Sequence, residues 1–243
     1  MNLLAVVPAR FDSIRFPGKP LAKILDKEML AWVVEGIQAA DVFNEIIVAT
    51  DHPEIATLAE KLNVSAAMTD KDIPTGTDRV YAASTNKDFD WVFNIQGDEP
   101  LVSAAALQGL AQLCENREDL NMATLASKLK QEDLQNPNAV KVICNQHNEA
   151  IYFSRFPIPF SRDPNYQEDV AFQHIGIYAY RKNFLKRYCE QPPTALEKKE
   201  SLEQLRALYM GEKIGVLVGD FETVGVDEPE DVARVEKILR SRV

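Results

Sequence analysis

The chain has 243 residues, and its 27 Lys and Arg against 37 Asp and Glu give a formal net charge of −10. Apolar residues make up 46% and charged residues 26%, values of a folded globular chain that exclude general disorder. Because nucleic acids and membrane surfaces attract basic faces, the acidic balance argues against both as partners. It still allows a small anionic ligand in a locally basic pocket.

The three cysteines, Cys114, Cys144 and Cys189, form no CxxC pair, so neither a disulfide scaffold nor a structural zinc site is expected. The opening residues MNLLAVVPAR lack the basic and apolar regions of a signal peptide, and no apolar run reaches the length of a membrane span. We therefore expect a cytoplasmic protein.

Apolar runs rich in β-branched residues alternate with amphipathic stretches in the first half of the chain. They predict strands over 3–7, 45–50 and 91–95, separated by helices over 29–40, 53–62 and 77–84. This alternation favours a parallel sheet with crossover helices. Each predicted strand runs into polar or turn residues, and open α/β sheets bind ligands beyond the carboxyl ends of their strands. We expect the site there.

The pattern changes after about residue 120. Strands are predicted over 122–127, 139–145, 151–154, 174–180 and 213–218. Several follow one another with only turns between them, which indicates antiparallel pairing. Three prolines in 156–165 predict an ordered loop or arm. Helices are predicted over 196–210 and 229–240, the second with Asp227 as a candidate N-cap.

Three cations, Arg10, Arg15 and Lys19, crowd the loop that follows the first predicted strand, and two prolines and a glycine stiffen it. Cations in such a place suit a triphosphate, whose transfer needs positive charge around the reacting phosphate. The alternative is a solvated basic loop. Neither the P-loop pattern nor Gly-x-Gly-x-x-Gly occurs, which disfavours an NAD-dependent oxidoreductase.

Two aspartates and one threonine-rich segment are further candidates. Asp98 follows a predicted strand through Gly97 and suits magnesium, although a strand-end aspartate is more often a turn or cap residue. Asp227 precedes an acidic helix start and has the same two interpretations. In 75–79 (TGTDR), Gly76 lets the backbone approach a ring or a phosphate, while Thr75 or Thr77 could simply cap the next helix.

These segments, in this order, resemble the motifs of the sugar-acid cytidylyltransferase family, which makes CMP-activated acidic sugars. The resemblance is greatest to the branch that acts on 3-deoxy-manno-octulosonate, and it extends from residue 3 to about 235. The matching segments are 8–20, 49–51, 75–79, 94–100, 152–155 with 158–159, 174–181, 202–206 and 225–227. The chain departs in having Glu228 where many members have Thr, and Thr75 where Ser is common.

The resemblance implies a three-layer α/β, nucleotide-diphospho-sugar-transferase-like (Rossmann-like) fold with a mostly parallel sheet and a small second-half extension. It implies one domain over 1–243. The nucleotide part spans about 1–120, a sugar-binding and dimerisation part about 121–220, and a C-terminal metal motif and helix about 221–243. It also implies a homodimer, Mg2+, and transfer of CMP from CTP to the anomeric hydroxyl of the acidic eight-carbon sugar, with release of pyrophosphate, for lipopolysaccharide biosynthesis.

The resemblance also implies roles for individual residues. Residues implied in catalysis are Arg10, Arg15, Lys19, Asp98 and Asp227, the two aspartates as metal ligands. Residues implied in nucleotide binding are Pro8, Ala9, Arg10, Ser13, Lys19, Thr75, Gly76, Arg79, Gln96 and Asp98. Residues implied in sugar binding are Arg15, Gln96, Arg155, His174, Tyr178, Glu203 and Gln204, with Arg162 a weaker candidate.

Several alternatives stay open at this point. The sugar could be the 8-amino analogue of the same acid; a sialic-acid-type substrate fits the segments 174–176 and 202–206 less well. The chain could also be a non-catalytic nucleotide-binding regulator, although the presence of both aspartates and all three loop cations speaks against that. No side chain stands out as a general base, so activation of the sugar hydroxyl by the metal is the preferred account.

Overall fold

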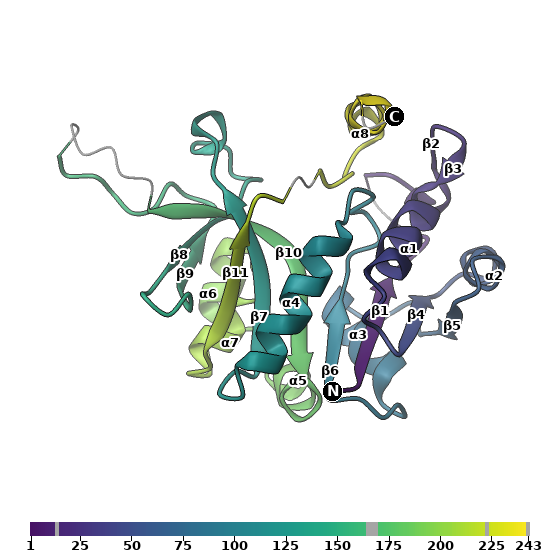
Figure 1. The fold of residues 1–243 in the computed structure, drawn as a ribbon, viewed down its shortest axis with the longest axis horizontal. Coiled ribbons are helices and arrows are strands. Elements are labelled where there is room, and N and C mark those ends of the chain that lie inside the picture. The colour runs from purple at the N-terminus through teal and green to yellow at the C-terminus, as the bar shows by residue number, and fades with distance from the viewer. Residues whose placement is uncertain (13–14, 164–169, 222–223, 242–243) are drawn as a thin grey trace. The chain divides into compact units, whose positions relative to one another are not determined.

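The computed structural model describes residues 1–12, 15–163, 170–221 and 224–241. The chain divides into two compact units. The first unit comprises Met1–Ala111 and Glu222–Val243, and the second comprises Gln112–Phe221. Figure 1 shows the chain coloured along its length. The assignment of functions to parts of the chain stays a prediction.

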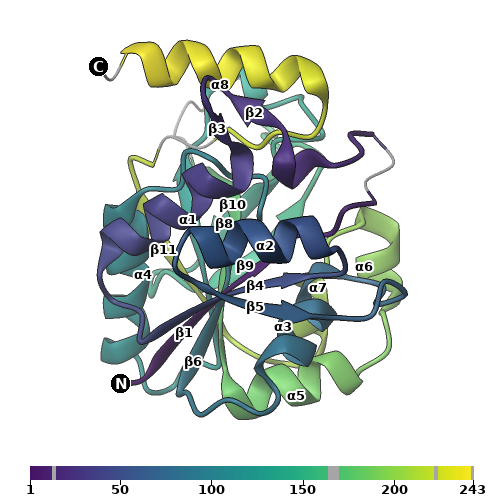
Figure 2. The ribbon, with the colours of Figure 1, turned by 90° about the vertical axis from the view of Figure 1, so that its right-hand side faces the viewer.

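The first unit contains a four-stranded parallel sheet. Its strands are β1 (Leu3–Pro8), β4 (Glu45–Thr50), β5 (Ser65–Met68) and β6 (Trp91–Asn94), in the order β6-β1-β4-β5. The helices between them are α1 (Met29–Ala40), α2 (Pro53–Lys61) and α3 (Gly76–Ser84), followed by α4 (Ala104–Asn116), which runs across the boundary into the second unit. Helix α2 packs against β4 and β5, as Figure 2 shows. The alternation of strands and helices predicted from the sequence is confirmed.

A second core in the first unit joins its two chain segments. The short hairpin of β2 (Lys23–Ile24) and β3 (Lys27–Glu28) packs near the last helix, α8 (Pro229–Ser241). Seven buried residues form the cluster: Ile24, Met29, Leu101, Val224, Val226, Val235 and Leu239. Their burial brings the C-terminal segment back to the residues that follow β6, because the apolar area is removed from water only in this arrangement.

The second unit contains a mixed sheet. Its strands are β7 (Met122–Lys128), β8 (Lys141–Cys144), β9 (Ala150–Ser154), β10 (Ala171–Arg181) and β11 (Ile214–Gly219). Strand β7 pairs with β10, β10 with β8, and β8 with β9, all antiparallel as predicted. Strand β11 pairs parallel with β7, which adjacency in sequence could not indicate. A register shift interrupts the pairing of β10 with β7 between Ile175 and Tyr178.

The single helix predicted over 196–210 is wrong. The structure has two helices there, α6 (Ala195–Glu200) and α7 (Leu205–Tyr209), after α5 (Lys182–Glu190). Thr194 and Glu197 form a capping box that starts α6, and Ser201 ends it in the left-handed conformation, with φ +53°. The break places Glu203 and Gln204 in the turn between the two helices. The sequence analysis also missed β5, α4 and α5.

The proline-rich segment is a loop, as predicted, in the part that the structure describes. Residues 156–163 contain no helix or strand. The side chains of Phe156 and Phe160 are largely in solvent, with 71% and 87% of their surface exposed, and Arg162 is exposed as well.

In the described residues, no helix combines the length and the apolar character that crossing a membrane requires.

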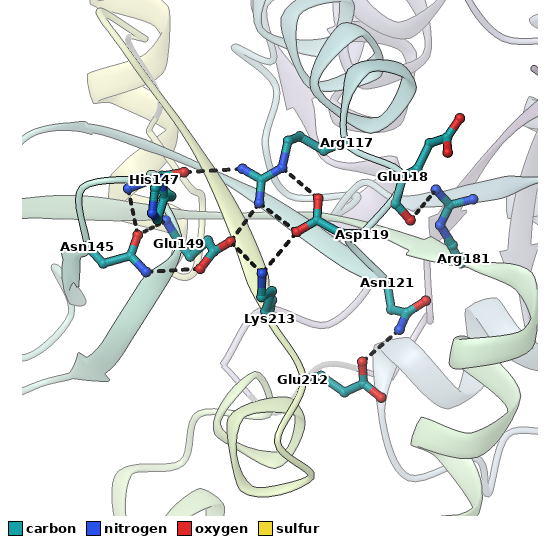
Figure 3. Close-up of polar contacts among 10 residues, drawn as sticks. All are labelled: Arg117, Glu118, Asp119, Asn121, Asn145, His147, Glu149, Arg181, Glu212 and Lys213. Atoms are coloured by element: carbon teal, nitrogen blue, oxygen red, sulfur yellow. Dashed lines mark hydrogen bonds and ion pairs between the residues drawn. The ribbon is translucent and has the colours of Figure 1, made fainter.

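A network of charges ties three segments of the second unit together (Figure 3). At the end of α4, Arg117 Nε lies 2.7 Å from Asp119 Oδ1 and Arg117 Nη2 lies 2.6 Å from Glu149 Oε1. Lys213, just before β11, contacts the same two carboxylates at 3.0 and 3.2 Å. The hydrogen bond from Arg117 and that from Lys213 hold the pKa of Asp119 below its usual value. Hydrogen bonds from Asn145, Arg117 and Lys213 lower the pKa of Glu149, against the effect of burial.

This network predicts a specific acid sensitivity. A carboxyl whose pKa is lower in the folded state adds stability above its unfolded pKa of about 4, and that stability is lost as the pH falls towards the folded value. Glu149→Gln should therefore give a urea midpoint that changes less between about pH 5.5 and pH 3.5 than that of the wild type. Glu115→Gln, an exposed change on α4, is the control. Equal pH slopes for the wild type and Glu149→Gln would contradict the prediction.

Candidate active site

The loop after β1 is folded back on itself in the structure. Gly18 N donates to Phe11 O at 3.0 Å, and Gly18 has φ +68°, a conformation that side chains with a Cβ rarely adopt. Lys19 then begins a 3-10 helix, η1 (Lys19–Leu21), whose Pro20 is buried. Arg10 is exposed, and its side chain has no ion-pair partner among the described residues. The predicted nucleotide-binding residue Ser13 lies outside the described residues.

Lys19 lies between the two aspartates predicted to hold metal. Its Nζ is 2.5 Å from Asp98 Oδ2 and 3.7 Å from Asp227 Oδ1, and it donates to the carbonyl of Val226 at 2.9 Å. Arg15 Nη2 lies 2.9 Å from Asp227 Oδ1. Ion pairs thus link four residues implied in catalysis, which the sequence spreads over more than 200 positions, in the order Arg15, Asp227, Lys19 and Asp98. Their roles in catalysis stay predictions.

The backbone explains why the two aspartates meet. Val226 is fully buried in the cluster formed with α8, and its N–H donates to Asp98 O at 2.9 Å. Asp227 follows directly and therefore emerges beside Asp98. Asp227 is the predicted N-cap of α8. The carboxylate that accepts hydrogen bonds at this helix start is instead that of Asp231, whose Oδ2 accepts from the N–H groups of Asp227 and Glu228. The Asp227 carboxylate is left to face Arg15 and Lys19.

Glu99 is a component that sequence reasoning missed, because it reads as part of a turn after Asp98. Its Oε2 is buried and accepts no hydrogen bond from the described residues. Burial, and after it the negative charges of Asp98 and Asp227, raise the pKa of Glu99 to about 8, while the charge of Lys19 acts in the opposite direction. The adjacent glycine, Gly225, is packed so closely that a Cβ there would lie 3.3 Å from Glu99 Oε1.

The donor set around Lys19 fits magnesium. Mg2+ is usually held by one or two carboxylates, with waters and substrate phosphate oxygens completing the shell. Asp98 and Asp227 supply two carboxylates that share one cation, Lys19, and the buried Glu99 Oε2 beside them has no hydrogen-bond partner among the described residues. No cluster of three or more His, Cys, Asp or Glu with metal-binding geometry occurs among the described residues, so a site closed by protein ligands alone is absent there.

Residues predicted to recognise the nucleotide base are neighbours in the first unit. A Cβ on Gly76 would lie 3.6 Å from both Gln96 Oε1 and Pro8 Cγ, so the start of α3 lies against the ends of β6 and β1. Gln96 Nε2 donates to Asn94 Oδ1 at 2.8 Å, which fixes its amide. Ala9 N continues the pairing of β1 by donating to Ala49 O. The arrangement brings Pro8, Gly76 and Gln96 to the carboxyl ends of the strands.

The side chains of Thr75 and Arg79 have structural partners. Thr75 Oγ1 accepts from Asp78 N and caps α3, which confirms that alternative for Thr75. Arg79 is buried: its Nη1 donates to Thr69 Oγ1 and its Nη2 lies 3.5 Å from Asp51 Oδ2. Asp51 Oδ1 accepts in turn from Phe11 N. Arg79 therefore supports the loop after β1 through Asp51, and a direct contact with nucleotide stays a prediction.

In the second unit, Arg155 acts as a clamp on the backbone. Its Nε donates to Glu200 O at 2.8 Å, its Nη1 to Pro137 O at 2.9 Å and its Nη2 to Ser201 O at 3.2 Å. These carbonyls belong to the turn before β8 and to the end of α6. If Arg155 binds a carboxylate as predicted, it must do so with the guanidinium N–H groups that these three hydrogen bonds do not engage.

The remaining predicted sugar residues form one polar group in the second unit. Tyr178 Oη donates to Gln204 Oε1 at 3.1 Å, and Gln204 Nε2 is buried without a partner among the described residues. The His174 ring lies 5.4 Å from the Tyr178 ring. Tyr188 Oη donates to the carbonyl of Glu203 at 2.6 Å. A buried amide donor without a partner is costly unless a ligand or a water accepts from it, which supports the prediction of Gln204 as a binding residue.

Sequence reasoning also missed Lys141, which lies in β8 and is fully buried. Its Nζ donates to Asn136 O at 2.9 Å and to Ala139 O at 2.8 Å, and burial lowers its pKa. Arg155 donates to Pro137 O in the same turn. Three backbone carbonyls of the turn therefore accept hydrogen bonds from two cationic side chains. A buried lysine is not visible in a strand pattern, because the pattern reads it as an exposed position.

Comparison with known proteins agrees with this geometry. The family model described as cytidylyltransferase matches residues 4–214. The chain belongs to the cytidylyltransferase family. The resemblance identified from the motifs is therefore confirmed, and the chain is an enzyme of the nucleotidyltransferase class.

Individual cytidylyltransferases match over their whole length. The 3-deoxy-manno-octulosonate cytidylyltransferase of Bdellovibrio bacteriovorus is 49% identical over 245 residues, with 100% of this chain and 99% of that protein covered. An enzyme of the same name from Actinobacillus pleuropneumoniae serotype 5b is 45% identical, with 98% and 100% covered. The solved structure of CMP:2-keto-3-deoxy-manno-octonic acid synthetase complexed with CTP superposes with a TM-score of 0.95 at 34% identity, covering 100% of both chains. The predicted α/β fold class is confirmed.

Proposed function

We propose that this cytidylyltransferase transfers CMP from CTP to the anomeric hydroxyl of 3-deoxy-manno-octulosonate, with release of pyrophosphate, in the supply of lipopolysaccharide precursors. The observation that carries the proposal is the meeting of Lys19, Asp98, Asp227 and Arg15 at the strand ends of the first unit. Full-length relatives that carry this enzyme name support the choice of sugar.

The loop cations would bind and neutralise the triphosphate. Arg10 is exposed, and the ion pair of Arg15 with Asp227 is itself largely exposed, so both guanidinium groups can turn to phosphate oxygens. Lys19 is anchored by Val226 O and is 14% exposed, which keeps its charge fixed at one place. A fixed charge contributes most to the transition state, because it needs no reorganisation when negative charge develops on the α-phosphate.

In the reaction, the oxygen of the sugar's C2 hydroxyl forms a bond to the α-phosphorus, and the bond from that phosphorus to the bridging oxygen breaks. Pyrophosphate leaves with the electron pair, and the hydroxyl proton passes to solvent. Asp98 and Asp227 would hold Mg2+, which when bound would neutralise phosphate charge and lower the pKa of the attacking hydroxyl. Gln96, Pro8 and Gly76 would recognise the base and ribose, while His174, Tyr178, Glu203 and Gln204 would bind the sugar acid.

Pyrophosphate release tests the proposal. We expect release that requires CTP, magnesium and the sugar acid together, and that falls when ATP, GTP or UTP replaces CTP. The 8-hydroxy and 8-amino sugars are compared side by side, and the 8-hydroxy acid should give the higher kcat/KM. Binding of CTP with no turnover on either sugar would instead establish a nucleotide-binding protein without this activity.

We also propose that the enzyme is a homodimer formed through the second unit and that it acts in the cytoplasm. The exposed Phe156 and Phe160, together with Ile151 at 56% exposure, offer apolar area of the kind that subunit interfaces cover. Sedimentation equilibrium should give twice the chain mass of 27.3 kDa. Phe160→Ser should weaken the dimer, whereas Met68→Ser, which changes an exposed residue of the first unit, should not.

A further inference from the structure

The hydroxyl of Thr124 lies in the middle of β7, and the residue is fully buried. Its Oγ1 has three polar neighbours. It lies 2.7 Å from the carbonyl of Ile177, 3.2 Å from the carbonyl of Ile175, and 3.0 Å from His174 Nε2. All of these groups belong to the second unit, and no proposed role in the reaction has included Thr124.

The register shift in β10 explains this concentration of partners. Pairing between β10 and β7 breaks off after Ile175 and resumes at Tyr178, which lies opposite Thr124. The carbonyls of Ile175 and Ile177 are directed to the Thr124 hydroxyl instead. Gly176 lies within the shift, and a Cβ there would meet no heavy atom within 4 Å, so the irregularity does not arise from crowding. The Thr124 hydroxyl thus provides a hydrogen-bond partner for the backbone carbonyls at this irregularity.

Counting protons fixes the direction of each hydrogen bond. A hydroxyl carries one proton and can accept two hydrogen bonds, whereas a carbonyl oxygen only accepts. The Thr124 proton therefore goes to the carbonyls: the 2.7 Å contact assigns it to Ile177 O, and Ile175 O at 3.2 Å can only share it as the longer branch of the same bond. The remaining contact, with His174 Nε2, can form only if that nitrogen carries a proton and donates to Oγ1.

The other ring nitrogen of His174 follows from the charge of the ring. The half-buried ring of His174 packs against Phe153, with ring centroids 5.0 Å apart, and lies 5.4 Å from the ring of Tyr178. Burial lowers the pKa of His174 to about 3, so the imidazole is neutral at neutral pH. A neutral imidazole with a proton on Nε2 has none on Nδ1. Nδ1 is then a hydrogen-bond acceptor.

We propose that Thr124 is a positioning residue that fixes the Nε2–H tautomer of His174 and so presents Nδ1 as an acceptor for a hydroxyl of the sugar acid. The inference rests on the proposed placement of the sugar beside His174. It adds a specific direction to that contact: the sugar donates and the protein accepts. Gln204 Nε2, which has no hydrogen-bond partner among the described residues, would in contrast donate a hydrogen bond to a sugar oxygen.

Nitrogen-15 NMR of histidine-labelled protein without substrate tests the tautomer directly. The chain has three histidines, so variants lacking His52 or His147 assign the signals. In the wild type and in Thr124→Ser, the His174 Nε2 should carry the proton. In Thr124→Val, which keeps the shape and removes the hydroxyl, the proton should move wholly or partly to Nδ1. A proton on Nδ1 in the wild type, or an unchanged tautomer in Thr124→Val, overturns the proposal, and the wild-type measurement stands even if the valine variant does not fold.

Kinetics then separate positioning from a merely structural role. Thr124→Val should raise the KM for the sugar acid at least about fivefold, because a buried ring nitrogen and the sugar hydroxyl are left mismatched. The KM for CTP should stay within about twofold, and Thr124→Ser should restore the sugar KM. A shifted tautomer with an unchanged sugar KM, or equal changes in both KM values, overturns the role in sugar binding. Failure of the wild type to use the sugar, with the tautomer as expected, would fault the proposed function instead.

Discussion

Asp98→Asn should lower kcat by about a hundredfold or more while leaving the fold intact. The amide keeps the shape of the side chain but loses the negative charge that a magnesium ligand needs, and electrostatic terms of this kind contribute about 10² to 10³ in rate. Asp98 is at a strand end with its side chain 31% exposed, so the change should cost little stability. Steady-state pyrophosphate release measures kcat, and thermal melting checks the fold.

A matched control is available near the second aspartate. Glu230→Gln removes an exposed carboxylate in the first turn of α8 and leaves Asp227 and its cation partners in place. Its kcat should stay within about twofold of the wild type. An Asp98→Asn enzyme that keeps activity within about threefold would remove Asp98 from the metal site and would reopen its interpretation as a turn residue.

Lys19→Ala should lower kcat more than it raises the KM for CTP. Lys19 is held at 2.5 Å from Asp98 and by Val226 O before any substrate binds, so its charge serves the transition state more than the ground state. We expect kcat to fall by about two orders of magnitude, the size of effect seen when a preorganised charge is removed from a developing anion. Initial rates at saturating sugar, with CTP varied, separate kcat from KM.

Lys23→Ala is the control for Lys19, because Lys23 is a nearby lysine whose side chain is 62% exposed. It should leave both kinetic constants near their wild-type values. A Lys19→Ala enzyme with unchanged kcat and a raised KM would assign Lys19 to ground-state binding of the triphosphate. No change in either constant would restore the interpretation of the segment as a solvated basic loop.

Strands β1, β4 and β6 of the first unit, and helices α1 to α3, could be predicted because their burial pattern is simple, whereas β5 and α4 were missed. Residues Ala5 to Val7 are fully buried in β1, and a run of β-branched and apolar residues records that burial directly. The break at Ser201 could not be predicted in the same way. An amphipathic pattern continues through it, and only the hydrogen bond from Ser201 N to Glu197 O in the left-handed conformation shows that α6 ends there.

The residues of the candidate site likewise fall into those that the sequence could predict and those that it could not. Arg15, Lys19, Asp98 and Asp227 could be proposed from the positions of charges after strands and from the family motifs. Glu99, Lys141 and Thr124 could not, because their significance lies in burial and in the partners that burial leaves them. Arg155 is an intermediate case. Its residue type suited a carboxylate, while its guanidinium is occupied by three backbone carbonyls whose positions depend on the whole second unit.

The return of the C-terminal segment to the first unit decides when activity can appear during synthesis. Val226 and Asp227 are more than 200 residues from the loop that they complete, and the buried cluster needs Val235 and Leu239 from α8 as well. A nascent chain that has reached residue 221 can form the parallel sheet but has one aspartate at Lys19 instead of two. Intermediates that stop before α8 should therefore be inactive, and enzymatic activity should begin only once α8 has left the exit tunnel of the ribosome.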